Sequence, residues 1–442
     1  MRLTILGGGG FRVPLVYAAL LRDHEPGRIT EVVLHDVDPA RLSGTARVLA
    51  EQAAGVPDAP EVTTTADLDA ALRGADFVFS AIRVGGTRGR VVDERVALAE
   101  GVLGQETVGA GGIAYGLRTV PVARRIAARV AELAPEAWVI NFTNPAGMVT
   151  EAMAELLGRR VIGICDSPLG LCRRLTRAYE LSADARFDYA GLNHLGWVRA
   201  IEVDGHDVLP KLLADPGRLT SFEEGALFGA DWLRTLGSLP NEYLYYYYFN
   251  RESVAAATAA TETRGAFLAR QQDAFYTELA RPDAAALEAW QRARLRREET
   301  YMAENRAGQR AAEDLESGGY QDVALALMRA IAHDEPAELI LNIRNGSTVS
   351  IVDGDAVVEV PCTVDGSGVR SLPVGPFDEH QAGLVCAVKA VERDVIEAAR
   401  TGSREAARRA FACHPLIDSA AVAQRLLESY VRELPGLAYL RP

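Results

Sequence analysis

The sequence predicts an α/β protein that begins with a doubly wound parallel sheet and continues into an α+β domain. Apolar strands alternate with amphipathic helices over the first third of the chain, a pattern typical of βαβ units. Consecutive glycines at positions 7–10 follow the first strand, as in Rossmann-type folds. The alternation stops after Pro168. We therefore expect a Rossmann-like domain over residues 1–168 and an α+β domain over residues 169–442.

The elements of the first domain follow from short apolar runs and from helical periodicity. We expect strands at residues 2–6, 31–35, 76–81, 138–141 and 161–165. We expect helices at residues 14–21, 39–54, 67–72 and 120–133. Because strands joined through a helix pair in parallel, these elements predict a sheet covered by helices on both faces.

The second domain lacks this regular alternation. Helical periodicity predicts helices at residues 169–180, 255–279, 284–304, 323–332, 379–401 and 403–412. A β-rich segment covers residues 339–374. Since no low-complexity linker separates the halves, we expect the second domain to pack against the first and to carry the substrate, metal and oligomer contacts.

Composition excludes several classes of function. The net charge of −13, without a basic stripe, argues against binding nucleic acid. No apolar run reaches about 18 residues, the length that crosses a bilayer, so we expect no membrane association. The first strand starts at once, with no signal pattern, and the five cysteines are scattered, as expected of reduced thiols. We expect a cytoplasmic enzyme.

The glycine-rich turn is the predicted cofactor site. Glycines let the backbone approach a pyrophosphate, and the helix that follows supplies N–H donors. We expect Gly7, Gly9, Gly10 and Phe11 to contact the cofactor. Asp36 closes the second strand, where an acidic side chain binds the adenosine ribose and selects NAD over NADP. A helix-capping role is the alternative for Asp36, but both features together favour NAD.

A cysteine and a histidine are the predicted metal ligands. Cys165 ends the last apolar strand of the first domain, where ligands enter a parallel sheet, and His194 follows Asn193 in a glycine-bounded turn. A thiolate and an imidazole suit a soft divalent metal, and two protein ligands leave positions open for substrate hydroxyls. The neighbouring pair Cys413 and His414 is a rival that we interpret as structural.

Polar loops after the apolar strands supply further candidates. N-F-T-N-P carries Asn144, and G-Q-E-T carries Glu106. Arg83 and Arg90 follow the third predicted strand, and Arg264 lies in T-E-T-R-G. Clustered arginines suit a phosphorylated or carboxylated substrate.

Taken together, these motifs resemble glycoside hydrolase family 4, and within it the 6-phospho-β-glucosidases. The likeness extends over nearly the whole chain. It rests on the glycine-rich start, G-Q-E-T-x-G, N-F-T-N-P, G-x-C-x-x-P, G-L-N-H-L, N-x-Y-L-x-Y-Y, V-E-V-P-C and the late H-P-L. The resemblance implies a fold like that of lactate and malate dehydrogenases, NAD and Mn²⁺ or another divalent metal as cofactors, and a homodimer or homotetramer.

The resemblance also implies a redox-assisted hydrolysis, which departs from the usual pair of carboxylates. NAD oxidises the sugar's 3-hydroxyl, Tyr243 removes the acidified C2 proton, the aglycone leaves by elimination, water adds, and NADH reduces the ketone. Cys165 and His194 then hold the metal. The implied substrate contacts are Asn144, Asn193, Arg264, Arg83 and Arg90, with Arg264 and one or more of Arg83 and Arg90 binding the 6-phosphate. The products are glucose 6-phosphate and the aglycone.

Two positions depart from this pattern. Asp166 follows Cys165 where phospho-β-glucosidases usually have Asn, and it resembles the acid that protonates the leaving group in phospho-α-glucosidases. Gly10, Phe11 and Arg12 stand where family members often have serines that hold the phosphate. The sequence therefore leaves open the anomer and whether the substrate is phosphorylated. A 6-phospho-α-glucosidase or a glycosidase of unphosphorylated sugars is the alternative.

Two readings from other classes remain. An NAD-dependent 2-hydroxy acid dehydrogenase shares the fold but needs a catalytic His–Asp pair and no metal. A non-catalytic NAD sensor predicts the loss of ligands or base, yet these positions are all occupied.

Overall fold

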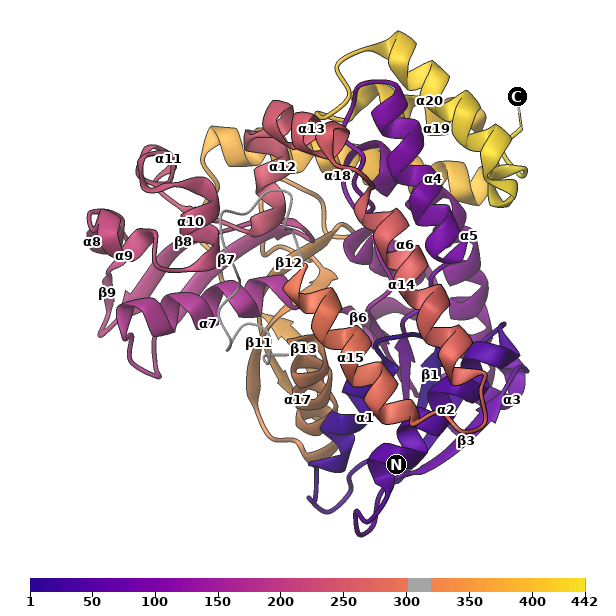
Figure 1. Ribbon diagram of the computed structural model, residues 1–442. Coiled ribbons are helices and arrows are strands. Elements are labelled where there is room, and N and C mark those ends of the chain that lie inside the picture. The colour runs from indigo at the N-terminus through magenta and orange to yellow at the C-terminus, as the bar shows by residue number, and fades with distance from the viewer. Residues whose placement is uncertain (301–318, 442) are drawn as a thin grey trace.

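The computed structural model describes residues 1–300 and 319–441. Within them one mixed sheet runs through the molecule (Figure 1), and its strand order is β10-β8-β7-β12-β11-β6-β5-β4-β1-β2-β3. The first half contributes β1 (Arg2–Leu6), β2 (Glu31–His35), β3 (Glu61–Thr65), β4 (Phe77–Ser80), β5 (Trp138–Asn141) and β6 (Val161–Gly163). These strands pair in parallel in the order 3-2-1-4-5-6 of a Rossmann sheet, which confirms the predicted fold class.

Helices of the first half cover both faces of the parallel strands. They are α1 (Val13–Leu21), α2 (Pro39–Ala53), α3 (Leu68–Leu72), α4 (Gly86–Ala99), α5 (Gly109–Leu133) and α6 (Ala146–Leu157). Pro14 lies in the first turn of α1, and the side chain of Asp38 caps α2. The sequence prediction missed β3, α4 and α6, and it started α5 eleven residues late because the glycines at its N-terminus disfavour a helix.

The second half extends the same sheet with antiparallel strands. They are β7 (Arg186–Leu192), β8 (Leu195–Val203), β9 (His206–Asp207), β10 (Leu239–Pro240), β11 (Ala337–Arg344), β12 (Val357–Asp365) and β13 (Gly368–Ser371). β11 joins the two halves by pairing with β6. The hairpin of β7 and β8 was missed by the sequence prediction. The division into two domains at residue 168 stays a prediction, since the sheet continues across it.

Two predicted elements near the carboxyl ends of the parallel strands need correction. β6 ends at Gly163, so Cys165 lies two residues beyond the strand, in the connection to α7 (Ser167–Tyr179). The single helix predicted over 255–279 is two helices, α13 (Asn250–Ala259) and α14 (Arg264–Leu279). α15 (Ala286–Glu299) ends before the predicted boundary, and residues 301–304 lie outside the described residues.

The remaining helices surround the extended sheet. They are α8 (Leu209–Leu213), α9 (Pro216–Leu219), α10 (Glu223–Phe228), α11 (Ala230–Leu236), α12 (Tyr245–Tyr248), α17 (Tyr320–His333), α18 (Glu379–Thr401), α19 (Arg404–Cys413) and α20 (Ala420–Glu433), with short 3₁₀ turns η1 (Gly158–Arg160), η2 (Glu242–Leu244) and η3 (Pro435–Leu437). In Figure 1, α14 and α15 lie beside one another in front of the first half. There α14 contacts α4, and α15 contacts α2. This contact brings the second half over the glycine-rich turn.

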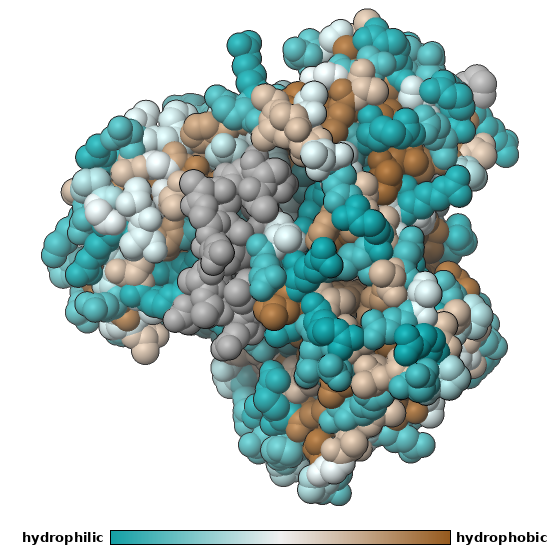
Figure 2. All heavy atoms as spheres, viewed as in Figure 1, coloured by the Kyte–Doolittle hydropathy of each residue, from teal (hydrophilic) through white to brown (hydrophobic). Residues whose placement is uncertain are grey.

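The face drawn in Figure 2 is mostly hydrophilic, with small scattered hydrophobic areas. Among the described helices, none is both long enough and apolar enough to span a membrane.

Candidate active site

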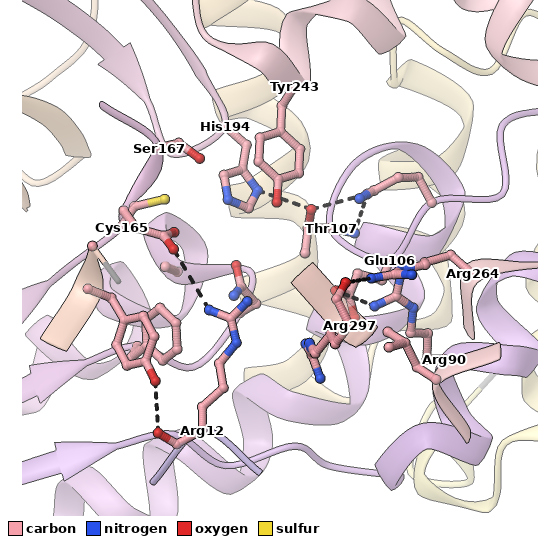
Figure 3. Close-up of a pocket in the computed structure, with 18 of the residues that line it drawn as sticks. Arg12, Arg90, Glu106, Thr107, Cys165, Ser167, His194, Tyr243, Arg264 and Arg297 are labelled. Atoms are coloured by element: carbon pink, nitrogen blue, oxygen red, sulfur yellow. Dashed lines mark hydrogen bonds and ion pairs between the residues drawn. The ribbon is translucent and has the colours of Figure 1, made fainter. Parts of the chain in front are cut away.

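A cavity of about 360 Å³ opens at the carboxyl ends of β1, β4, β5 and β6. In a doubly wound sheet this edge is where ligands bind. Most of the predicted site residues line it: Gly7, Gly10, Phe11, Arg83, Arg90, Asn144, Cys165, Asp166, His194, Tyr243 and Arg264. Three do not line it, namely Gly9, Asp36 and Asn193. Figure 3 shows how the side chains converge from both halves of the chain.

Main-chain geometry requires glycine in the turn after β1. Gly7 has φ +83°, and a Cβ there would lie 2.5 Å from the carbonyl oxygen of Ala81. A Cβ on Gly9 would lie 3.0 Å from Oδ2 of Asp36. The backbone N–H of Gly9 donates to that same Oδ2 over 2.9 Å. Packing within the protein therefore requires glycine at positions 7 and 9, while Gly7 and Gly10 line the cavity without a side chain, which lets a ligand approach the backbone.

Asp36 holds this turn in place. Its Oδ2 accepts from the N–H of Gly9, and its Oδ1 accepts from the N–H of Asp38 over 3.0 Å. The carboxylate thus links the glycine-rich turn to the start of α2. A contact between Asp36 and a ribose stays a prediction.

Aromatic side chains of the second half fix the carbonyls of the same turn. The Tyr276 hydroxyl donates to the carbonyl of Gly9 (2.6 Å), and the Trp290 indole donates to that of Phe11 (2.9 Å). Tyr320 donates to the carbonyl of Arg12 over 2.8 Å. These donors hold the carbonyl oxygens of the turn in place, Tyr276 and Trp290 from outside the cavity and Tyr320 from its lining. Phe11 itself lines the cavity and is buried in this aromatic packing.

Cys165 and His194 come together across the cavity. In Figure 3 the thiol of Cys165 points toward the imidazole of His194. Both side chains are buried, and burial lowers the pKa of His194 to about 3, which keeps the ring neutral. Burial, with help from the charges of Glu359 and Asp166, raises the pKa of the Cys165 thiol. A neutral imidazole and a thiol in a confined space form a donor set that fits a soft divalent metal.

The surroundings of this pair also fit a catalytic rather than a structural metal. Among the residues described, no group of three or more His, Cys, Asp or Glu side chains could hold a metal ion. A site with two protein ligands keeps positions free for substrate oxygens. Oδ1 of Asn144, at the same cavity, is buried and finds no hydrogen-bond partner in the described protein. That atom is an acceptor available to a ligand.

Tyr243 lies directly on the imidazole of His194. The two rings are parallel within 6°, and their centroids are 3.6 Å apart. Tyr243 belongs to η2, which Asn241 starts by accepting the N–H of Tyr243 on its side chain. The structure therefore places the predicted base beside the predicted metal ligand, although the two are far apart in sequence.

Arg83 and Arg90 are paired with carboxylates within the protein. Nη1 of Arg83 lies 2.6 Å from Glu106, and Nη1 of Arg90 lies 2.7 Å from the other oxygen of Glu106. Burial opposes the ionisation of Glu106, but the two arginines hold its pKa well below the usual range. Arg90 also binds Glu94, which accepts the N–H of Gly265 over 2.7 Å. This network ties α4 to the start of α14.

Arg297 is a cavity residue that the sequence prediction missed. It lies in the last turn of α15, and its guanidinium faces the ring of Phe11 at 5.5 Å. Burial and the positive charges of Arg12 and Arg264 lower its pKa to about 9. Within the described ranges, no carboxylate forms an ion pair with Arg297. Excess positive charge in a confined space favours the binding of an anion.

The remaining predicted residues have clear places. Asp166 faces Arg12, with 3.8 Å between their charged atoms, beside Cys165. Arg264 lies at the start of α14 and donates to the carbonyl of Arg297 over 2.9 Å. Asn193 does not line the cavity, and its side chain donates to Glu359 over 3.2 Å, so its predicted substrate contact lacks support from the geometry. The rival His414 accepts the N–H of Leu416 on Nδ1, as a structural residue does.

Other cavity residues gave weak signals in the sequence. Thr107 stands in G-Q-E-T, a motif in which only Glu106 was named as a candidate. Arg297 stands in an arginine-rich helix that is typical of a solvated face. Glu242 precedes Tyr243 and accepts from Ser167 over 2.6 Å, and burial raises its pKa to about 7. Only the tertiary contacts distinguish these residues from ordinary surface groups.

The fold and the site together define a nucleotide-dependent α/β enzyme. Its Rossmann-type sheet carries a glycine-rich turn, a cysteine–histidine pair and a stacked tyrosine at the edge where ligands bind. The sequence pattern described as family 4 glycosyl hydrolase matches residues 2–181, and that of the family 4 glycosyl hydrolase C-terminal domain matches residues 189–417. The chain belongs to glycosyl hydrolase family 4, which confirms the resemblance seen in its motifs.

Similar proteins include enzymes named for both anomers. The chain is 32% identical to a Bacillus subtilis protein named probable 6-phospho-beta-glucosidase, over 97% of this chain and 95% of that one. A Thermotoga maritima 6-phospho-beta glucosidase, solved with manganese, NAD⁺ and glucose-6-phosphate, is 26% identical with a TM-score of 0.82, over 98% of both chains. A 6-phospho-alpha-glucosidase from gut microorganisms, in complex with NAD and glucose-6-phosphate, is 27% identical with a TM-score of 0.83, over 99% of this chain and 98% of that one.

Proposed function

We propose that the chain hydrolyses 6-phospho-β-glucosides to glucose 6-phosphate and the aglycone with the help of NAD and Mn²⁺. The observation that carries the proposal is a single cavity that joins four parts. These are the glycine-rich turn, the pair Cys165 and His194, the stacked Tyr243, and an arginine cluster with excess positive charge. Relatives whose names include 6-phospho-glucosidase support the choice of substrate.

The residues present fit both cofactors. The turn at residues 7–10, held by Asp36, would bind NAD, and Cys165 with His194 would bind the metal. When bound, NAD takes up and returns a hydride at the sugar's C3, and the metal polarises the adjacent hydroxyls.

The chain's own groups would handle the proton and the phosphate. The phenol oxygen of Tyr243 would take the proton from C2, and stacking on His194 fixes the plane of the ring that carries it. Arg297 and Arg264, beside the paired Arg83, would bind the 6-phosphate. Oδ1 of Asn144 would accept a hydrogen bond from a sugar hydroxyl.

Replacing Arg297 with Gln tests the phosphate site. We expect Arg297→Gln to raise KM for p-nitrophenyl 6-phospho-β-glucoside by about 10- to 150-fold, since a hydrogen bond to a charged group contributes roughly 1.5–3 kcal/mol. Initial rates of nitrophenol release measure the change. Arg296→Gln removes an exposed charge from the same turn of α15 and is expected to leave KM within about twofold, the change typical of a surface substitution. An equal KM in wild type and Arg297→Gln would contradict the assignment.

A 6-phospho-α-glucosidase is the second candidate, because Asp166 lines the cavity next to Cys165. We favour the β anomer because the carboxylate of Asp166 faces Arg12 and the pair must open before Asp166 can act as an acid. The α- and β-anomers of p-nitrophenyl 6-phosphoglucoside, assayed side by side with Mn²⁺, NAD and a reductant, decide between them. Faster nitrophenol release from the β-anomer, without accumulation of NADH, is the expected result. Preference for the α-anomer would support the second candidate.

We also propose a cytoplasmic location and a homodimer or homotetramer. Five free cysteines support a reducing compartment. Sedimentation of the full chain measures the oligomeric state.

A further inference from the structure

We infer that Thr107 is a positioning residue that sets the tautomer of His194. In this arrangement the ring proton stays on Nδ1, and Nε2 keeps its lone pair free toward the cavity. The inference rests on the proposed function, in which His194 is a metal ligand. Thr107 is not a ligand in this inference, but it decides whether Nε2 of His194 has a free lone pair for the metal.

Hydrogen bonds in the loop before α5 identify the oxygen that starts the network. The side chain of Gln105 accepts the N–H of Thr107 over 2.6 Å and the N–H of Val108 over 2.9 Å. Both partners are backbone donors, so the accepting atom of Gln105 is its Oε1 and not its amide nitrogen. The Thr107 hydroxyl donates to the same oxygen over 3.1 Å.

The tautomer of His194 follows from this donor arrangement. A threonine hydroxyl has one proton, and Oε1 of Gln105 can only accept. Both contacts of Oγ1 of Thr107 are therefore hydrogen bonds only when that proton points to Gln105. Oγ1 of Thr107 also lies 3.0 Å from Nδ1 of His194, so this second bond must use an oxygen lone pair and a proton on Nδ1. In a neutral ring that carries its proton on Nδ1, the other nitrogen, Nε2, is unprotonated. An unprotonated nitrogen is what metal coordination requires.

Packing holds the hydrogen-bonded residues Gln105, Thr107 and His194 in place. A Cβ on Gly111 would lie 2.0 Å from the carbonyl oxygen of Gln105, and one on Gly112 would lie 2.6 Å from that of Thr107. Only glycines at the start of α5 therefore let this loop lie against the helix. On the other side, His194 has φ +63° in the turn between β7 and β8, and its ring is stacked on Tyr243. Figure 3 shows Thr107 and His194 joined between these supports.

Nitrogen NMR of the ¹⁵N-labelled, metal-free chain measures the tautomer directly. The His194 signals are assigned by their loss in His194→Asn. We expect Nδ1–H in the wild type and in Thr107→Ser, which keeps the hydroxyl. In Thr107→Val, and in the smaller Thr107→Ala, we expect a shift toward Nε2–H. Electron paramagnetic resonance of unbound Mn²⁺ should show the Mn²⁺ dissociation constant rising about 10- to 100-fold in Thr107→Val and Thr107→Ala, as for other partners of metal-bound histidines.

The two measurements separate the inference from the proposed function. Thr107→Val and Thr107→Ala that fold, as judged by thermal unfolding, yet keep Nδ1–H would overturn the role of Thr107. A shifted tautomer with an unchanged Mn²⁺ dissociation constant would also overturn it as a positioning residue of the metal site. If His194→Asn binds Mn²⁺ as tightly as the wild type, the proposed metal site fails, and the role of Thr107 toward the metal fails with it.

Discussion

Cys165→Ser is expected to lower Mn²⁺-dependent release of nitrophenol from p-nitrophenyl 6-phospho-β-glucoside by more than about 100-fold. Removing a residue that is only hydrogen-bonded to a metal ligand already lowers activity by up to about 100-fold, and Cys165 is a predicted ligand itself. The substitution replaces a soft sulfur ligand with a hydroxyl that holds its proton and binds a divalent ion weakly. Cys165 is buried at the cavity beside His194, so no other thiol is placed to substitute for it among the described residues. Steady-state rates over a Mn²⁺ titration measure the effect.

Cys386 offers the matched control. It is an exposed free thiol on α18, away from the cavity lining. We expect Cys386→Ser to keep turnover and Mn²⁺ affinity within about twofold, as for other surface substitutions. Wild-type turnover in Cys165→Ser would rule out Cys165 as a metal ligand. A similar loss in both variants would indicate that thiol chemistry, rather than metal binding, limits the reaction.

Tyr243→Phe is expected to lower kcat by about 10²- to 10⁴-fold with little change in KM, which is the usual contribution of a positioned base. The variant keeps the ring that stacks on His194 and removes only the phenol oxygen. Substrate carrying hydrogen at C2, incubated in deuterium oxide, provides a second measurement. Wild type should incorporate deuterium at C2, and the variant should not.

A neighbouring tyrosine serves as the control for this variant. Tyr245 lies two residues along, and its ring stacks on Phe249 with centroids 4.8 Å apart, away from the cavity lining. We expect Tyr245→Phe to leave kcat within about twofold, as for other substitutions outside the site. Full deuterium incorporation by Tyr243→Phe would show that another group removes the C2 proton.

Much of the fold was predictable because its strongest signals are local. The apolar runs at β1, β2 and β5 gave correct boundaries, and the glycines after β1 marked the turn. The hairpin of β7 and β8 escaped prediction because glycines interrupt it. Gly196 is needed there because a Cβ would lie 2.4 Å from the hydroxyl of Tyr189. That contact exists only once the strands have paired, and a glycine weakens the strand signal in the sequence itself.

The candidate site was predictable only where a residue type carries its chemistry with it. Cys165 and His194 have such chemistry, whereas the role of Tyr243 was predicted only through the resemblance to the family. The structure places all three on one cavity. Thr107 and Arg297 are ordinary residue types. The role proposed for Thr107 depends on its contact with His194, 87 positions away in the sequence, and the role proposed for Arg297 depends on the charges of neighbouring arginines.

The sequence by itself determined most strands of the parallel sheet, the glycine turn and the two predicted soft ligands, because these depend on neighbours along the chain and on the chemistry of single side chains. The tertiary structure decided how the polar groups are used. Asp36 holds the turn, Asn193 binds Glu359 outside the cavity, and Arg297 remains without a carboxylate in the described residues. Charge and hydrogen bonding act across space, and their balance is set only when distant segments pack together.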